Sequence, residues 1–293
     1  MADPGLAAGT APAPERLLLC TDLDRTLLPN GRQPESPQAR PLFARLVQRP
    51  EVTLAYVSGR DAGLVAEAIR DYALPTPDWV VADVGTTLLQ VSPEGWISHR
   101  GWHQAIGRDW GGRTASDIQD LLADLDRLHL QEPSKQNTYK LSFYTELGSD
   151  VSSLQVEMQR RLNRQGFQAS LIYSIDEPAQ IGLLDVLPAS ATKLHAIQFL
   201  MQTLNFPMSQ TLFAGDSGND LPVMQSELPS VLVANADQTV IAQLDCKPGE
   251  RHSEWNLYLA RGGFMGMNGN YSAGILEGFL HFHPHLSTWL EAC

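Results

Sequence analysis

Two aspartates follow directly on the first apolar run of the chain. Residues 17–20 read LLLC, and residues 22–26 read DLDRT. A short, wholly apolar run is typical of a strand buried on both faces of a parallel sheet. Because side chains alternate along a strand, Asp22 and Asp24 leave its end on the same side, close enough to share one cation and one phosphate. A surface turn with two acids is the alternative interpretation, and this short motif alone does not decide between them.

Three later apolar runs resemble the first, and helical patterns separate them. The runs cover residues 52–57, 79–82 and 211–214. Apolar side chains at helical spacing occupy residues 38–48 and 63–72. Strands that alternate with helices predict an α/β fold with a doubly wound, Rossmann-like parallel sheet. In such folds ligands bind beyond the carboxyl ends of the strands.

A segment without the strict alternation of strands and helices interrupts this core. Thr114 and Asp117 have capping-box spacing before an apolar helical face over residues 118–128. Another helical pattern and three strand candidates follow without strict alternation, over residues 151–162, 139–144, 169–173 and 181–186. The sequence therefore predicts an inserted α+β domain over residues 104–187, within a core formed by residues 15–103 and 188–293.

Composition argues against several classes of protein. The formal net charge is -12, whereas a nucleic-acid groove needs clustered Lys and Arg to bind phosphate backbones. Residues 1–14 are rich in Ala, Pro and Gly without the pattern of a signal peptide, so we expect a disordered lead-in. No apolar run approaches the ~20 residues of a membrane-spanning helix, and the cysteines have neither metal-ligand nor disulfide spacing. We expect a soluble, cytoplasmic protein that binds neither nucleic acid nor membrane.

Residues that suit phosphate or metal chemistry follow the other predicted strands. Ser58 and Gly59 follow the second strand, where a hydroxyl and a backbone N–H near a helix start form an anion site. Residues 215–220, GDSGND, follow the fourth strand and add two carboxylates and an amide. Lys193 begins a helical pattern after Thr192 as its cap, and supplies a cation. Each motif alone has an ordinary structural explanation, but the set favours a site for phosphate and metal.

At these motifs the sequence resembles the haloacid dehalogenase (HAD) superfamily of phosphatases. The four motifs of that superfamily have counterparts in residues 22–26, Ser58, Lys193 and residues 215–220. The inserted domain resembles the α/β cap of the type IIB branch. More narrowly, the chain resembles the sucrose-phosphate phosphatase family, through DVGT at 83–86, KLSFY at 140–144 and YSAGILEG at 271–278.

The resemblance implies a Mg²⁺-dependent phosphatase that works through an aspartyl phosphate. Asp22 would attack phosphorus, and Asp24 would protonate the leaving oxygen and then activate water. The Mg²⁺ ion would bind Asp22, the backbone carbonyl of Asp24 and Asp216. Asp220 would be a further ligand, either directly or through water.

The same resemblance implies that four residues bind the phosphoryl oxygens, namely Ser58, Gly59, Lys193 and Asn219. Leu194 departs from the family, which often has Gly after the third-motif lysine, and Gly would permit a closer approach of the backbone. The role of Arg60 stays open between contact with the substrate and support of the site. Trp102 and Trp110 either stack on a sugar ring or pack at the hinge of the insert.

The sugar-phosphatase resemblance favours sucrose 6-phosphate or a related disaccharide phosphate as the substrate. Two alternatives stay open. A phosphomutase resembling phosphomannomutase would need cations in the cap, and the insert offers Lys135, Lys140, Arg160 and Arg161. A regulatory partner of a sugar-phosphate synthase is the non-enzymatic alternative, although such a protein has no need of both carboxylates. An active enzyme could also bind a synthase.

Overall fold

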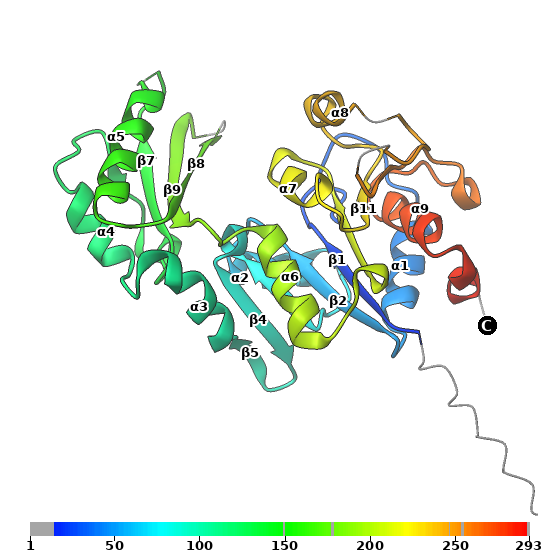
Figure 1. Ribbon diagram of the computed structural model, residues 1–293. Helices are drawn as coiled ribbons and strands as arrows, with labels where there is room; N and C mark the ends of the chain where they lie inside the picture. Colours follow the sequence, from blue (N-terminus) through cyan, green and yellow to red (C-terminus); the bar gives the residue numbers. More distant parts are fainter. Residues whose placement is uncertain (1–14, 149, 177–178, 246, 253–254, 292–293) are drawn as a thin grey trace, which may run out of the picture.

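The structure, a computed structural model, describes residues 15–148, 150–176, 179–245, 247–252 and 255–291. Within these residues the chain forms an eight-stranded and a four-stranded sheet (Figure 1). The expected lead-in over residues 1–14 lies outside the described residues, as do Cys246 and Cys293. No helix of the described residues is long and apolar enough to cross a membrane.

The larger sheet contains the predicted parallel core. Its strands are β1 Leu17–Thr21, β2 Val52–Val57, β3 Trp79–Ala82, β4 Thr87–Ser92, β5 Gly95–Ser98, β10 Thr211–Gly215, β11 Ser230–Leu232 and β12 Leu257–Leu259. In spatial order they run β12, β11, β10, β1, β2, β3, β4 and β5. Every neighbouring pair from β12 to β3 is parallel, whereas β4 and β5 are antiparallel additions at one edge. All four predicted strands are therefore confirmed.

Helices cover both faces of this sheet, as a doubly wound fold requires. One face packs against α1 Ala39–Val47, α2 Ala62–Asp71 and α9 Ser272–Phe282. The other face packs against α3 Arg100–Gly107, α6 Lys193–Leu204, α7 Leu221–Met224 and α8 Gln238–Leu244. Short 3-10 segments lie between these elements: η1 Asp83–Gly85, η2 Arg108–Trp110, η3 Pro133–Lys135, η4 Met208–Gln210, η5 Gly218–Asp220, η6 Phe264–Gly266 and η7 Pro284–Leu290.

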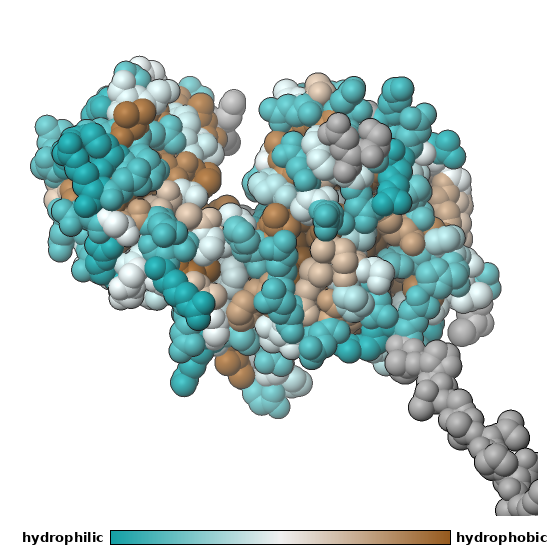
Figure 2. All heavy atoms as spheres, in the orientation of Figure 1, coloured by the Kyte–Doolittle hydropathy of each residue, from teal (hydrophilic) through white to brown (hydrophobic). Residues whose placement is uncertain are grey.

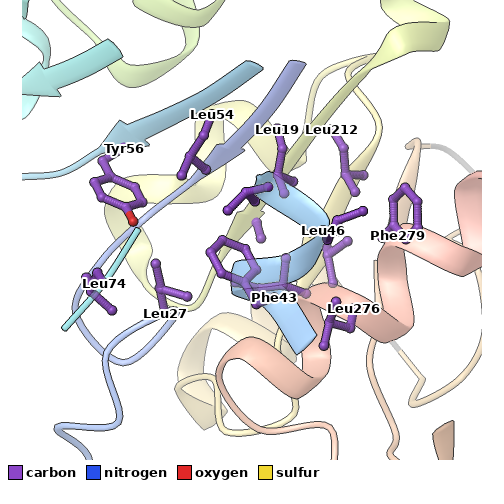
Figure 3. Close-up of a cluster of buried hydrophobic side chains, with 14 of the residues drawn as sticks. Leu19, Leu27, Phe43, Leu46, Leu54, Tyr56, Leu74, Leu212, Leu276 and Phe279 are labelled. Carbon is purple, nitrogen blue, oxygen red and sulfur yellow. The ribbon is translucent and has the colours of Figure 1, made fainter. Parts of the chain in front are cut away.

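The side chains of β1 alternate between two apolar clusters, one on each face. Leu17 and Leu19 belong to the cluster under α1 and α9, whereas Leu18 and Cys20 belong to the cluster under α6. Figure 3 shows the first cluster, where Leu19 lies among side chains of α1 and α9. Because both faces are buried, the strand is an unbroken apolar run in the sequence.

The smaller sheet belongs to the segment inserted between β5 and α6. Its strands are β6 His129–Leu130, β7 Leu141–Thr145, β8 Ala169–Asp176 and β9 Ile181–Pro188. They are all antiparallel, in the order β6, β7, β9, β8. One face is covered by α4 Ala115–Leu122 and α5 Val151–Arg164, and the opposite face is turned toward the core across a hollow (Figures 1 and 2). The predicted α+β cap is present, and its exact boundaries at residues 104 and 187 stay predictions.

One predicted helix is too long. The apolar spacing over residues 118–128 predicts a helix that reaches Leu128, but α4 ends at Leu122. Two turns follow, in which the N–H of Leu125 donates to Leu122 O and the N–H of Leu128 donates to Leu125 O. Leu125 and Leu128 still pack on the apolar cluster of the cap. Burial of these two leucines, without a helix, explains why the apolar spacing continues.

The two tryptophans at the start of the insert pack inside the protein. Trp102 is buried, and its Nε1–H donates to Gly85 O at 3.0 Å. Trp110 is fully buried and has edge contacts with the rings of Tyr139 and Phe167. Neither ring is available to stack on a sugar, because Trp102 packs in an apolar cluster of the core and Trp110 in that of the cap.

Gly278 lets α9 approach β11 closely. A Cβ at residue 278 would lie 2.1 Å from Cγ2 of Val231, which is fully buried. We therefore expect Gly278→Ala to lower the free energy of unfolding by about 1–3 kcal/mol, measured by urea denaturation, although Ala favours helices more than Gly does. In the double variant Gly278→Ala/Val231→Ala the second truncation relieves the overlap, so the combined loss should be smaller than the sum of the single losses. Strictly additive losses would contradict this contact.

Candidate active site

Three strand ends meet at one edge of the larger sheet. β1 lies between β2 and β10, and all three run parallel, so the residues directly after them stand side by side. These residues are Asp22, Ser58 and Asp216. A pocket at this edge is lined by Asp22, Asp24, Arg25, Gly59, Arg60, Asp216, Ser217 and Asn219. The topology therefore brings the first, second and fourth sequence motifs to one pocket.

The backbone around Asp22 fixes its carboxylate. Its N–H donates to Ala214 O at 2.9 Å, which continues the pairing of β1 with β10. Its Oδ1 accepts the N–H of Leu23 at 2.8 Å, and its Oδ2 lies 3.2 Å from Lys193 Nζ. Both carboxylate oxygens therefore have a defined direction before any ligand binds.

The loop after β10 folds tightly around the carboxylate of Asp220. Oδ2 of Asp220 accepts the N–H groups of Asp216 and Ser217, both at 3.1 Å. A Cβ at residue 215 would lie 2.5 Å from this oxygen, so Gly215 leaves the room that the turn needs. As a result, one oxygen each of Asp22, Asp216 and Asp220 lie within 4.8 Å of one another.

Lys193 reaches this cluster from the first turn of α6. The Oγ1 of Thr192 accepts the N–H of His195 at 3.2 Å, which confirms Thr192 as the helix cap. Lys193 Nζ lies 2.7 Å from Asp220 Oδ1 and 3.2 Å from Asp22 Oδ2. Leu194, the departure from the family pattern, packs beside the apolar cluster under α6 and leaves this ammonium in place.

Burial opposes the ionisation of two carboxylates in the cluster. Desolvation raises the pKa of Asp22 to about 7, although the charge of Lys193 opposes the shift. Desolvation, together with the charge of Asp220, raises the pKa of Asp216 to about 6. Burial also opposes ionisation of Lys193, but Asp22 and Asp220 raise its pKa to about 12, so it stays charged. At Asp22 and Asp216, burial therefore outweighs the positive charges of Lys193 and Arg25.

Asp216 has an oxygen atom suited to a metal ion. Its Oδ1 accepts the hydroxyl of Thr26 at 3.2 Å, whereas its Oδ2 is buried and accepts no hydrogen bond from the described residues. Arg25 Nε lies 3.4 Å from this oxygen. A buried carboxylate oxygen without a hydrogen bond is unfavourable unless a cation compensates it, and a cluster of carboxylate oxygens suits Mg²⁺. Asp22 and Asp216 are thus placed to hold a divalent cation.

The carboxylate of Asp24 is engaged by two other side chains. Arg60 donates Nε–H to Oδ2 at 2.7 Å and Nη2–H to Oδ1 at 2.6 Å, and Asn30 Nδ2–H donates to Oδ1 at 2.7 Å. Although partial burial opposes it, these contacts lower the pKa of Asp24. Asp24 is therefore an ionised carboxylate beside the pocket. Arg60 supports Asp24 in this way and also lines the pocket, so its contact with a substrate stays a prediction.

Ser58 and Gly59 lie in a turn that precedes a helix. Ser58 is buried, and its Oγ accepts the N–H of Arg60 at 3.2 Å. α2 begins only at Ala62, because Asp61 is its cap and accepts the N–H of Leu64. These residues therefore lie before the helix, in agreement with the helical pattern that the sequence places over residues 63–72.

Asn219 is oriented by its side-chain oxygen. Oδ1 accepts Lys193 Nζ–H and the hydroxyl of Ser217, both at 3.0 Å. Its Nδ2 lies 4.0 Å from the point where a Cβ of residue 59 would stand. The amide N–H groups of Asn219 therefore lie next to Gly59, on the wall of the pocket.

Several residues that surround the site have no role in the predictions from the sequence. Thr26 belongs to the DLDRT motif, and a hydroxyl two residues after Asp24 could have been assigned a role. Arg25 has φ 56°, a left-handed conformation that is uncommon for a residue other than Gly, Asn or Asp. Asn30 and Asn235 hold its two ends, since Arg25 N–H donates to Asn30 Oδ1 at 2.8 Å and Asn235 Nδ2–H donates to Arg25 O at 2.6 Å. No periodic pattern marks these two asparagines.

Comparison with known proteins agrees with this arrangement. The sequence model of the sucrose-6F-phosphate phosphohydrolase family matches residues 15–283. A HAD-like hydrolase of Nitrosococcus oceani is 53% identical over 277 residues, which cover 94% of this chain and 74% of that protein. A protein of Arabidopsis thaliana described as sucrose-phosphatase 2 is 28% identical over 237 residues; the match covers 78% of this chain and about half, 53%, of the Arabidopsis protein.

A solved structure has the same fold over almost the whole chain. It is the sucrose-phosphatase of Synechocystis sp. PCC6803, in complex with sucrose and phosphate. The TM-score is 0.67 at 25% identity, with 92% of this chain and 98% of that chain covered. The motifs, the α/β core with its inserted cap and these similarities identify a phosphatase, that is, a phosphoric monoester hydrolase of the HAD superfamily. The chain belongs to the sucrose-6F-phosphate phosphohydrolase family.

Proposed function

We propose that this protein hydrolyses a sugar phosphate with Mg²⁺ as cofactor, and that sucrose 6-phosphate or a related disaccharide phosphate is its substrate. The observation that carries the proposal is the cluster beside the pocket. It combines a buried carboxylate at a strand end, Asp22, with a buried Asp216 oxygen that accepts no hydrogen bond from the described residues, and with the ammonium of Lys193. This set supports attack on phosphorus, metal binding and charge neutralisation at one place.

Asp22 is the nucleophile of the proposed reaction. One of its carboxylate oxygens bonds to phosphorus while the bond from phosphorus to the sugar oxygen breaks, which leaves an aspartyl phosphate. When bound, Mg²⁺ supplies positive charge that keeps Asp22 ionised and offsets charge on the phosphoryl oxygens. Asp216 and the backbone carbonyl of Asp24 are its proposed ligands with Asp22. Both oxygens of Asp220 already accept hydrogen bonds from the protein, which favours an indirect role for that residue.

Asp24 is the proposed acid and base. In the first step its carboxyl gives a proton to the leaving sugar oxygen, and in the second it takes a proton from the water that attacks phosphorus and releases Asp22. The structure holds Asp24 as a carboxylate beside Arg60, which is the form needed for the second step. The first step needs a protonated Asp24, so its contact with Arg60 has to weaken when substrate binds.

Residues in and beside the pocket are the proposed donors for the phosphoryl oxygens. Asn219 and Gly59 line the pocket and offer amide and backbone N–H groups, and the buried Lys193 and Ser58 beside it offer an ammonium and a hydroxyl. These groups come from three separate elements, so a phosphoryl group bound there is contacted from several sides. Positioning and charge neutralisation are the main contributions that such a site makes to phosphoryl transfer.

The cap face that is turned toward the core is the proposed sugar-binding surface. Alternation along the strands places Tyr144, Ile172, Ser174 and Asp185 on the face opposite α4 and α5. This face combines apolar area with hydrogen-bonding groups, as recognition of a sugar requires. The amide of Gln136 is less available for a sugar hydroxyl, because it already bonds to the backbone of Gln131 and Ser142.

The phosphomutase alternative gains no support from the cap cations. Lys135 and Lys140 pair with core carboxylates, and Arg160 and Arg161 pair with acidic residues on the helical side of the cap. These contacts direct none of the four side chains to a position where it could hold the far end of a sugar phosphate. A synthase partner and a cytoplasmic location stay predictions.

The nucleophile can be tested by replacement. With Mg²⁺ and a panel of sugar phosphates, we expect phosphate release that is fastest with a disaccharide phosphate. Asp22→Asn should lower kcat by at least about 1,000-fold, because the amide cannot form the aspartyl phosphate. Asp120→Asn, an exposed position of α4, is the matched control and should keep native turnover. Absence of phosphate release from every sugar phosphate would refute the proposed function, and full turnover by Asp22→Asn would refute the nucleophile.

Metal affinity should depend on pH. Asp22 and Asp216 have pKa values of about 7 and about 6 in the metal-free protein, so both must lose protons when Mg²⁺ binds. We expect the affinity for Mg²⁺ to rise from about pH 5.5 to about pH 8, by up to about tenfold per pH unit for each displaced proton. Calorimetric titrations in two buffers of different ionisation enthalpy measure both the affinity and the proton release. A constant affinity without proton release would contradict the assignment.

Removal of Arg60 should change the pH profile of turnover. The Arg60 guanidinium lowers the pKa of Asp24, so Arg60→Gln raises it. Where Asp24 acts as a base, the acidic limb of the kcat profile should then move to higher pH by about one unit. Arg60→Lys keeps the positive charge and should move the limb less. Identical profiles for the native protein and both variants would show that Arg60 does not act on Asp24 during turnover.

A further inference from the structure

We propose that Asn30 is a positioning residue for Asp24, an inference that rests on the proposed phosphatase function. Its side-chain amide uses both ends on neighbouring groups. Oδ1 accepts the N–H of Arg25 at 2.8 Å, and Nδ2–H donates to Asp24 Oδ1 at 2.7 Å. One planar group therefore fixes both the side chain of Asp24 and the peptide bond that follows it.

That peptide bond joins Asp24 to Arg25 and carries two functional groups. Its C=O belongs to Asp24 and is the proposed backbone ligand of Mg²⁺, and its N–H belongs to Arg25. Because the peptide unit is planar, holding the N–H fixes the direction of the C=O. The contact from Asn30 Oδ1 to Arg25 N–H thus sets the orientation of a metal ligand without touching the metal.

The local backbone needs this support. Arg25 has φ 56°, which L residues with long side chains rarely adopt. Asn235 holds the other end of Arg25, since its Nδ2–H donates to Arg25 O at 2.6 Å. Asn235 is buried and also accepts the N–H of Tyr271 at 2.7 Å, so it is tied to the core. Of the two asparagines that hold Arg25, Asn30 is the exposed one.

Asn30 and Arg60 act on Asp24 in different ways. Arg60 brings a positive charge to both oxygens of the carboxylate, whereas Asn30 is neutral and contacts one oxygen. The Arg60 contacts leave the peptide after Asp24 free to rotate, and the Asn30 contact does not. Asn30 therefore fixes the direction of the peptide bond after Asp24, which the Arg60 contacts do not hold.

The chemistry of the two contacts explains why the residue is asparagine. The site needs one acceptor and one donor in the same plane, and an amide has both. An aspartate would keep the acceptor for Arg25 N–H but would place a second carboxylate oxygen against Asp24 Oδ1. An alanine would remove both contacts. Because Asn30 is exposed, neither change opens a cavity in the core.

The experiment compares Asn30→Ala, Asn30→Asp and the control Asn163→Ala, an exposed asparagine of α5. Each full-length variant is assayed for kcat and KM on the best substrate of the panel, for Mg²⁺ affinity by calorimetry without substrate, and for Tm. We expect Asn30→Ala to lower kcat by about 10–100-fold and Mg²⁺ affinity by about tenfold, with KM within about twofold and Tm unchanged. Asn30→Asp should keep more of the Mg²⁺ affinity than Asn30→Ala but lose kcat at least as strongly.

The outcomes separate this inference from the proposed function. If the native protein releases no phosphate from the panel, the proposed function fails, and the calorimetric comparison still decides whether Asn30 orients the metal site. If the native protein is active but both Asn30 variants keep native kcat and Mg²⁺ affinity, the inference is overturned. It is also overturned if kcat falls only together with Tm, since Asn30 would then stabilise the fold and not the site.

Discussion

The carboxylate cluster beside the pocket depends on the contacts of the Lys193 ammonium group. This ammonium lies 3.2 Å from Asp22 and 2.7 Å from Asp220, and all three side chains are buried. Removal of one partner from a buried ion pair typically costs about 3–5 kcal/mol, because the remaining charge has no compensation. Thr192 starts α6 at the residue that this contact requires, and Gly215 leaves room for Asp220. Oδ2 of Asp216, in contrast, accepts no hydrogen bond from the described residues, and the nearest cation is Arg25 Nε at 3.4 Å. Lys193 therefore compensates Asp22 and Asp220, whereas the Asp216 side of the cluster can still accept a cation.

The parallel centre of the fold could be predicted because burial leaves a strong pattern there. β1 and β2 are buried on both faces, and such strands are unbroken apolar runs. β11 and β12 have only three residues each, but the apolar runs around them, VLVA at 231–234 and LYLA at 257–260, are as long as the run of β3. The sequence could therefore have indicated these two strands, whereas the partly exposed β5 has no such run. The excess length predicted for α4 has a related cause. Leucines that pack on one cluster keep a helical spacing even where the backbone has left the helix.

The sequence pattern also predicts only part of the candidate site, and the three-dimensional structure shows the rest. Asp22, Asp216 and Lys193 could be found because strand and helix ends fix their places, and a parallel sheet brings its carboxyl ends to one edge. Arg60, Asn30 and Asn235, which hold Asp24 and Arg25 in place, have no comparable pattern in the sequence. Asn235 is 210 residues from Arg25 in the chain, and Arg60 is 36 residues from Asp24. These contacts depend on loop geometry, which has no period in the sequence, so only the three-dimensional structure identifies them.

Two salt bridges between cap and core end on neighbours of Arg60. Lys135 of the cap pairs with Asp61, and Lys140 pairs with Asp83, whose N–H donates to Arg60 O at 2.8 Å. Asp61 is also the next residue in the chain after Arg60. Two salt bridges and one peptide hydrogen bond therefore join the cap to the backbone that carries the Asp24 partner. In the proposed reaction, a sugar that shifts the cap would act on these contacts as well as on its own hydroxyl partners. The choice of sugar by the cap would then be linked to the state of Asp24 in the core, since both depend on where this short segment lies.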